Sequence, residues 1–146
     1  MSGARLQYLT ENDWVLIRAR AERRAFGLGE QIIRQGDLGK SFYVIRKGEA
    51  SVEVASSGGR TILAWLGPED VCGDMAFLEQ GRYSAAVVAK DEEVEIDEIN
   101  AHHLRELLQD FPGLASRFYQ SLALVLVRRL KVTSAELARE MAQRDR

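Results

Sequence analysis

The sequence predicts a mainly β fold with helices: a small antiparallel β-barrel or jelly roll with a short N-terminal helix and a long C-terminal helix. Two observations support this prediction. By residue 66 the chain has passed through roughly six short strand-like runs separated by glycine-bearing turns, which is the spacing of a small barrel or sandwich. From Asn100 the apolar pattern changes to a helical period, and Pro112 opens a second, longer helix where its missing N–H is harmless.

The individual elements follow from local signals. Thr10 precedes three polar or acidic residues, 11–13, and is expected to cap a short helix that runs to about Arg20. Two short strands are expected on either side of the glycine turn at 27–29. Further β-branched or alternating runs predict strands at 41–46, 50–54, 61–66, 85–89 and 94–99. Asn100 is expected to cap the helix that follows the last of these strands.

Composition narrows the class of protein. A chain of 146 residues fits a single domain, and 20 Lys and Arg against 22 Asp and Glu give no electrostatic drive toward nucleic acid. The lone Cys72 excludes an intrachain disulfide and fits a reducing compartment. No apolar run approaches the roughly 18 residues that span a bilayer, and the N-terminus lacks the apolar core of a signal peptide. We therefore expect a cytoplasmic domain without a membrane span.

One stretch, residues 73–87, carries the main functional signal. Gly73 and Asp74 introduce a turn and a short helical segment, and backbone N–H groups that converge at such a turn suit an anion. The carboxylate of Asp74 would repel a phosphate beside it but could accept hydrogen bonds from a sugar hydroxyl. The stretch therefore predicts a sugar phosphate ligand. No nucleophile-elbow or P-loop pattern is present, so we expect no enzymatic activity from this chain.

The C-terminal helix, residues 112–146, has two apolar surfaces. A seam with 3,4 spacing predicts pairing with the same helix of a second subunit, and hence a homodimer. Its members are Ala123, Leu126, Leu130, Thr133 and Leu137. The other surface is expected to cover the β-strands, and its members are Leu114, Phe118, Leu122, Val125 and Val132. The helical composition continues to the last residue, so we expect a longer protein with an effector domain beyond Arg146.

Nearly the whole chain, from about Trp14 to Met141, resembles the cyclic-nucleotide-binding domain, and in particular the sensor domain of the catabolite activator (cyclic AMP receptor) proteins. The segments that carry the resemblance are 29–37, 43–48, 73–76 and 128–134. It implies one domain over 1–146, with the first helix and the β-barrel at about 10–111 and a capping and dimerisation helix at 112–146. The implied ligand is a cyclic mononucleotide, with no metal and no other cofactor.

The resemblance also implies roles for matching residues. Asp74 takes the place of the family glutamate that accepts from the ribose 2′-hydroxyl, and Tyr83 takes the place of the arginine that neutralises the phosphate. The implied ligand-binding residues are Val52 and Leu63 beside the base, Gly73, Asp74, Met75 and Ala76 in the turn, Arg82, Tyr83 and Ser84 near the phosphate, and Thr133 and Ser134 reaching the base from the helix.

Simpler readings of several residues stay open. Arg82 is also explained as a solvated loop cation, and Tyr83 as an aromatic residue that covers the end of the barrel. Thr133 and Ser134 are also explained as polar positions that set the register of a dimer seam. The neighbouring histidines 102 and 103 lack partners at ligand spacing, which favours surface side chains over a metal site.

The sequence thus predicts a regulatory sensor domain for a 3′,5′-cyclic mononucleotide that signals through its C-terminal helix. Asp74 replaces the family glutamate and Tyr83 replaces the family arginine. The predicted ligands therefore include a pyrimidine cyclic nucleotide such as cyclic UMP or cyclic CMP. The resemblance suggests one kind of full-length protein to which this domain could belong: the bacterial antiphage effectors, which join such domains to TIR or membrane-damaging domains. The alternatives are a degenerate dimerisation module that binds no ligand, and the sensor half of a transcription regulator.

Overall fold

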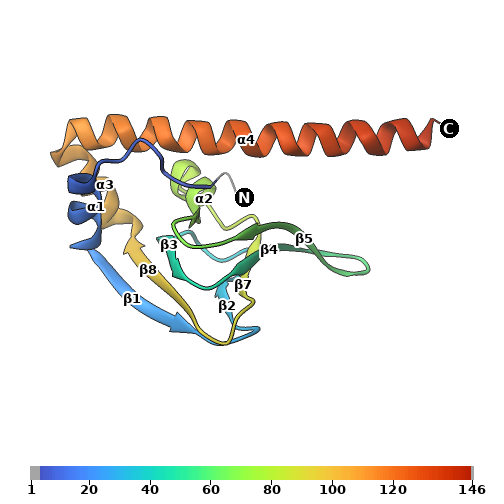
Figure 1. The fold of residues 1–146 in the computed structure, drawn as a ribbon, viewed down its shortest axis with the longest axis horizontal. Helices are drawn as coiled ribbons and strands as arrows, with labels where there is room; N and C mark the ends of the chain where they lie inside the picture. The colour runs from blue at the N-terminus through green and yellow to red at the C-terminus, as the bar shows by residue number, and fades with distance from the viewer. Residues whose placement is uncertain (1–3, 146) are drawn as a thin grey trace.

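The computed structural model describes residues 4–145, which form eight strands and four helices (Figure 1). In chain order the elements are α1 (Glu11–Arg18), β1 (Ala21–Phe26), β2 (Gln31–Ile33), β3 (Ser41–Lys47), β4 (Ala50–Ser56), β5 (Gly59–Leu66), β6 (Val71–Cys72), α2 (Asp74–Glu79), β7 (Ala86–Ala89), β8 (Val94–Asn100), α3 (Ala101–Asp110) and α4 (Pro112–Arg144). The predicted fold class is confirmed, including the short N-terminal and the long C-terminal helix.

The strands form two antiparallel four-stranded sheets and do not close into one barrel. One sheet has the order β1-β8-β3-β6 and the other the order β2-β7-β4-β5. The strands on either side of the 27–29 turn therefore lie in different sheets, because β1 pairs with β8 and β2 pairs with β7. β6, which the sequence did not indicate, extends the first sheet beside β3 and leads directly into α2.

The helix starts agree with the sequence signals. Thr10 caps α1 through a reciprocal capping box with Asp13, and α1 ends at Arg18, slightly before the expected Arg20. The Asn100 side chain accepts from two backbone N–H groups at the start of α3. Pro112 occupies the first turn of α4, where an N–H would have no helical partner.

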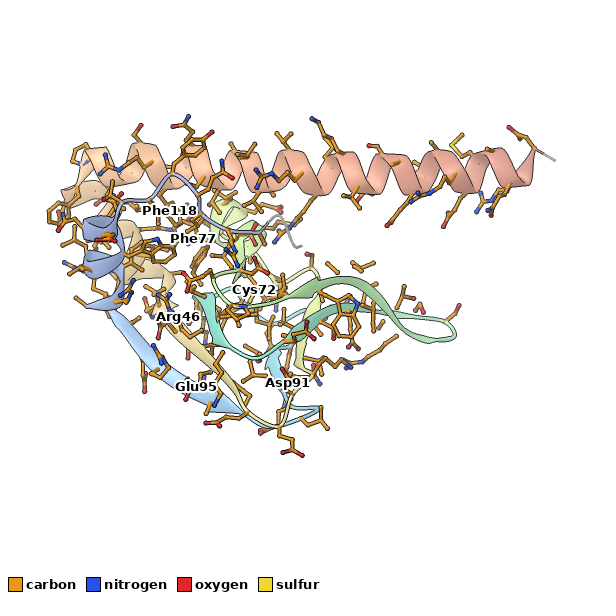
Figure 2. The ribbon with its side chains drawn as sticks, viewed as in Figure 1. Arg46, Cys72, Phe77, Asp91, Glu95 and Phe118 are labelled. Carbon is orange, nitrogen blue, oxygen red and sulfur yellow. The ribbon has the colours of Figure 1, made fainter. Side chains whose placement is uncertain are left out.

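The first half of α4 packs on the domain, whereas the second half runs above the β4–β5 hairpin without being buried there, and its last turns extend past the hairpin tip (Figure 1). Phe118 is fully buried, and its ring centroid lies 5.8 Å from that of Phe77 in α2 and 5.5 Å from that of Phe42 in β3 (Figure 2). Leu114, Leu122 and Val125 complete the buried face. The expectation that Val132 belongs to this face is wrong: Val132 is 57% exposed, and no other described part of the chain covers it.

Residues 4–9, which we call the N-terminal strap, run along α4 (Figure 1). The Val71 N–H of β6 donates to the Ala4 carbonyl over 3.0 Å, and the Tyr8 N–H donates to Ser121 Oγ of α4 over 3.1 Å. Further along α4, Arg128 donates to Gln7 Oε1 over 2.8 Å. The strap therefore ties α4 to the strand that precedes α2.

The ion pair between α1 and α4 gives a pH-dependent prediction. Arg117 donates from Nε and Nη2 to the buried Asp13 carboxylate over 2.6 and 2.8 Å, and this hydrogen bonding lowers the Asp13 pKa. Because the folded pKa lies below the unfolded one, the stabilisation is fully present above the ordinary aspartate pKa and is lost as the pH falls from there through the lowered pKa of the folded state. Asp13→Asn should cost about 1–3 kcal/mol at pH 7 and less at pH 3, measured by urea denaturation.

The matched control is Glu11→Gln, an exposed carboxylate in the same helical turn. It should change the free energy of unfolding by less than about 0.5 kcal/mol. An Asp13→Asn effect that is the same size at both pH values would contradict the assignment, since the pair would then not depend on the charge of Asp13.

Candidate functional site

The predicted turn joins β6 to α2 and is shaped by Gly73. This residue has φ +81°, in the left-handed region that favours glycine. A Cβ placed there would lie 3.1 Å from the Ser41 carbonyl oxygen and 3.3 Å from Tyr83 Cε1, so a larger residue would be strained as well as crowded. α2 ends after six residues, where the Gly81 N–H donates to the Ala76 carbonyl over 3.1 Å. We call residues 73–84 the cassette.

Asp74 is the buried charge of the cassette. It is 2% exposed, and both of its carboxylate oxygens accept from Nη1 of Arg129 in α4, over 3.1 and 2.8 Å. The Arg129 side chain is 36% exposed, so the pair lies at the edge of the domain with the carboxylate inside and the guanidinium outside. The residue predicted to accept from a ribose hydroxyl is thus joined directly to the long helix.

The three residues predicted near the phosphate have different surroundings. Arg82 is exposed and donates from Nη1 to the Gly36 carbonyl over 2.9 Å. Tyr83 is 8% exposed, and its hydroxyl bonds to the backbone of Ser41. Ser84 is exposed and follows Tyr83 toward β7. In the structure, the side chains of Arg82 and Tyr83 are therefore engaged with the β2–β3 loop and with β3.

The predicted base contacts lie on β4, β5 and α4. Val52 of β4 is half-buried and packs against the core, opposite Ala64 of β5. The register between the two strands shifts after this pair, and Leu63 is the extra residue on β5, 56% exposed. Thr133 and Ser134 are exposed. Thr133 follows Arg129 by one helical turn, so both lie on the same face of α4.

The remaining predicted residues also have defined positions. Met75 is 41% exposed on α2 and Ala76 is buried beneath it. Along the predicted dimer seam, Ala123 is exposed and Leu126 is half-buried, while Leu130 is 67% and Leu137 55% exposed. The distal seam therefore presents apolar side chains that residues 4–145 of one chain do not cover.

Arg129 is the site residue to which the sequence reasoning assigned no role. The structure brings it together with Asp74, whereas Arg82 is bound to the neighbouring loop. Its position offered a signal: it precedes Thr133 by four residues on a helix expected to cover the ligand, and it is a cation that could meet a buried carboxylate.

The described residues contain neither a metal-binding cluster nor a membrane-spanning helix. Over 4–145, no three His, Cys, Asp or Glu side chains gather in a way that could hold a metal ion. No helix within the same range is long and apolar enough to cross a membrane.

The two sheets, the cassette and the long α4 define a regulatory domain with the catabolite-activator fold. The crystal structure of the Thermus thermophilus catabolite activator protein superimposes with a TM-score of 0.75 at 30% identity, covering 89% of this chain and 59% of that one. Residues 23–111, more than half of the chain, match the sequence model of the cyclic nucleotide-binding domain. The chain belongs to this family.

Curated relatives agree with this assignment. The cyclic AMP receptor protein of Thermus thermophilus is 33% identical over 117 residues, which is 80% of this chain and 52% of that protein. The cAMP-activated global transcriptional regulator of Salmonella typhimurium is 31% identical over 107 residues, which is 73% of this chain and 49% of that protein. The chain thus spans about half the length of these two relatives.

Proposed function

We propose that this domain binds a 3′,5′-cyclic mononucleotide in the cytoplasm and transmits its presence through α4 to an effector segment beyond Arg146. The observation that carries the proposal is the Asp74–Arg129 ion pair, because it joins the cassette to the signalling helix. It acts as a regulatory domain and not as an enzyme.

The ion pair suggests how a ligand would act on α4. A ribose hydroxyl donating to Asp74 would compete with Arg129 for the same carboxylate oxygens. The displaced Arg129 guanidinium would then be free to bind the ligand phosphate. Because Arg129 belongs to α4, the helix would move with it. A ligand that makes these contacts in only one position of α4 stabilises that position, which is the physical basis of the signal.

The base is proposed to be a pyrimidine, as in cyclic UMP or cyclic CMP. Asp74 is one methylene shorter than the family glutamate, and Tyr83 adds no cation, so the cassette differs from the family pattern at two places. Thr133 and Ser134 supply hydroxyl groups that donate or accept, while Val52 and Leu63 supply apolar contacts to the ring. These groups are proposed to select the base once α4 has moved.

Isothermal titration calorimetry with cyclic AMP, GMP, CMP and UMP tests the proposal. One of the four should bind with a 1:1 stoichiometry per chain. In a separate thermal unfolding scan the same ligand should raise the melting temperature, because a ligand that binds only the folded state stabilises it. The corresponding 5′-monophosphates, which lack the ring phosphate ester, are the control ligands. If none of the four binds, the chain is the alternative, a degenerate dimerisation module.

We also propose that the chain forms a homodimer through the seam of α4. Leu130→Lys should convert a dimer to a monomer, since a charge would replace a side chain that is 67% exposed in one chain and buried between two. Val132→Lys is the matched control, because Val132 is also exposed but lies off the seam. Sedimentation velocity would decide: a wild type that is monomeric with and without ligand contradicts the dimer.

The effector is proposed to be a DNA-binding domain or an antiphage effector domain. The transcription-regulator alternative is favoured by the Salmonella typhimurium relative, which is named a transcriptional regulator and of which this chain spans about half. Nucleic-acid binding would then belong to the following segment, since this chain carries a net charge of −2. The sequence of the full gene product beyond Arg146 distinguishes the two effectors.

A further inference from the structure

We infer that Tyr83 is a positioning residue: its buried phenol anchors the cassette loop, residues 80–84, to the start of β3 and holds the loop in shape before a ligand arrives. The inference rests on the proposed function, because the loop matters only if the cassette receives a ligand. It differs from the role of the family arginine at this place, which is to bring charge to the phosphate.

The anchor is a pair of hydrogen bonds to a single residue. The Tyr83 hydroxyl accepts from the Ser41 N–H over 3.1 Å and donates to the Ser41 carbonyl over 2.7 Å. Both residues are more than nine-tenths buried, so neither bond is exchanged freely with water. Ser41 is itself fixed, because its Oγ donates to Glu98 in β8 over 2.7 Å. The phenol therefore ties the loop to the centre of the first sheet.

The backbone of the loop is held along its other edge. The Tyr83 N–H donates to the Asp37 carbonyl and the Gly36 N–H donates to the Tyr83 carbonyl, each over 2.9 Å. The Gly39 N–H donates to the Gly81 carbonyl, also over 2.9 Å. A Cβ on Gly39 would lie 2.6 Å from Ala76 Cβ, so the β2–β3 loop touches the cassette closely. The Tyr83 hydroxyl adds a side-chain contact that reaches from the cassette loop to β3.

The Tyr83 side chain can order the loop without bringing a charge to the site. Burial raises the pKa of Tyr83, so its hydroxyl stays protonated at neutral pH and keeps its donor. A neutral phenol engaged with Ser41 brings order to the loop and no charge to a phosphate. The charge at the cassette is supplied by Arg129 of α4 instead. In this chain Tyr83 therefore orders the loop, and Arg129 supplies the positive charge that the arginine brings in the family.

Tyr83→Phe tests the anchor, because it removes the hydroxyl and keeps the ring. Tyr119→Phe is the control: it removes the same hydroxyl from a tyrosine that lies on α4, is 45% exposed and belongs neither to the loop nor to β3. In the ligand-free protein, amide hydrogen exchange at 80–84 should be about tenfold faster in Tyr83→Phe and unchanged in Tyr119→Phe, since one lost hydrogen bond is worth roughly a factor of ten.

Calorimetry supplies the second measurement. The cyclic nucleotide that binds the wild type best should bind Tyr83→Phe about tenfold more weakly, and should bind Tyr119→Phe as it binds the wild type. Unchanged exchange at 80–84 in Tyr83→Phe overturns the anchor, as does a uniform rise that includes β7 and β8, which would indicate general loosening. Because exchange is measured without ligand, failure of all four cyclic nucleotides to bind would overturn the proposed function and leave the anchor to be judged on exchange alone.

Discussion

Arg129→Ala is expected to weaken cyclic-nucleotide binding by about 10- to 100-fold, which corresponds to the loss of hydrogen bonds to a charged group. The wild-type pair with Asp74 leaves the cassette with no net charge. Removing the guanidinium leaves a buried carboxylate that repels an anionic ligand. Arg82 is bound to Gly36 and Tyr83 is neutral, so neither compensates. Isothermal titration calorimetry at two salt concentrations measures the loss.

Arg128→Ala is the matched control for this measurement. Arg128 adjoins Arg129 on α4 and carries the same charge, but it donates to Gln7 of the N-terminal strap. Its removal should change affinity by no more than about threefold, the size expected of a screened surface charge. Equal losses in the two variants would show that general positive charge, and not the pair with Asp74, attracts the ligand. An Arg129→Ala protein that binds like the wild type would remove Arg129 from the site.

Phe118→Ala is expected to lower the free energy of unfolding by about 3–5 kcal/mol, the usual cost of emptying a buried phenylalanine position. Phe118 is fully buried, and its ring meets Phe42 of the first sheet and Phe77 of α2. The cavity would therefore open where α4, α2 and the sheet join. Urea denaturation followed by circular dichroism measures the change.

The neighbouring Tyr119 provides the control, because it is a similar aromatic residue that is 45% exposed. Tyr119→Ala should cost less than about 1 kcal/mol, as is usual for surface positions. The two variants also report on coupling. Since Phe77 belongs to α2, Phe118→Ala should weaken ligand binding as well as stability, whereas Tyr119→Ala should affect neither strongly.

The local features of the fold could be predicted from the sequence because neighbouring residues determine them. Thr10 and Asn100 cap helices with their own side chains, and Pro112 fits only the first turn of a helix. The apolar period of α4 separated the buried Leu114 and Phe118 from the exposed Leu130. Each of these signals lies within a few residues of the structure it specifies.

Pairing between distant strands could not be predicted in the same way. The turn at 27–29 suggests two adjacent strands, but β1 and β2 find their partners in β8 and β7, far along the chain. β6 is only two residues long, too short for any periodicity to be detected. The exposure of Val132 depends on how far along α4 the helix stays packed on the domain, which local sequence does not encode.

In the candidate site, too, some features could be predicted from neighbouring residues and others could not. Gly73 and Asp74 could be found as a turn because they are adjacent, and the residue at the arginine place could be counted from them. The direction of the Tyr83 side chain could not, because it depends on Ser41, which is 42 residues earlier. The partner of Asp74 lies 55 residues later. Side chains that converge from separate elements are determined by packing, and their roles emerge only in three dimensions.

The N-terminal strap has a consequence for how the domain is made. Tyr8 bonds to Ser121, 113 residues away, and Gln7 bonds to Arg128, 121 residues away. Residues 7 and 8 are therefore synthesised well before their binding surface on α4 exists. During synthesis the β-sheets can pair, and Ala4 can bond to β6, before the strap meets α4. The arrangement of α4 over the cassette is thus completed only after residues 121–128 have been synthesised.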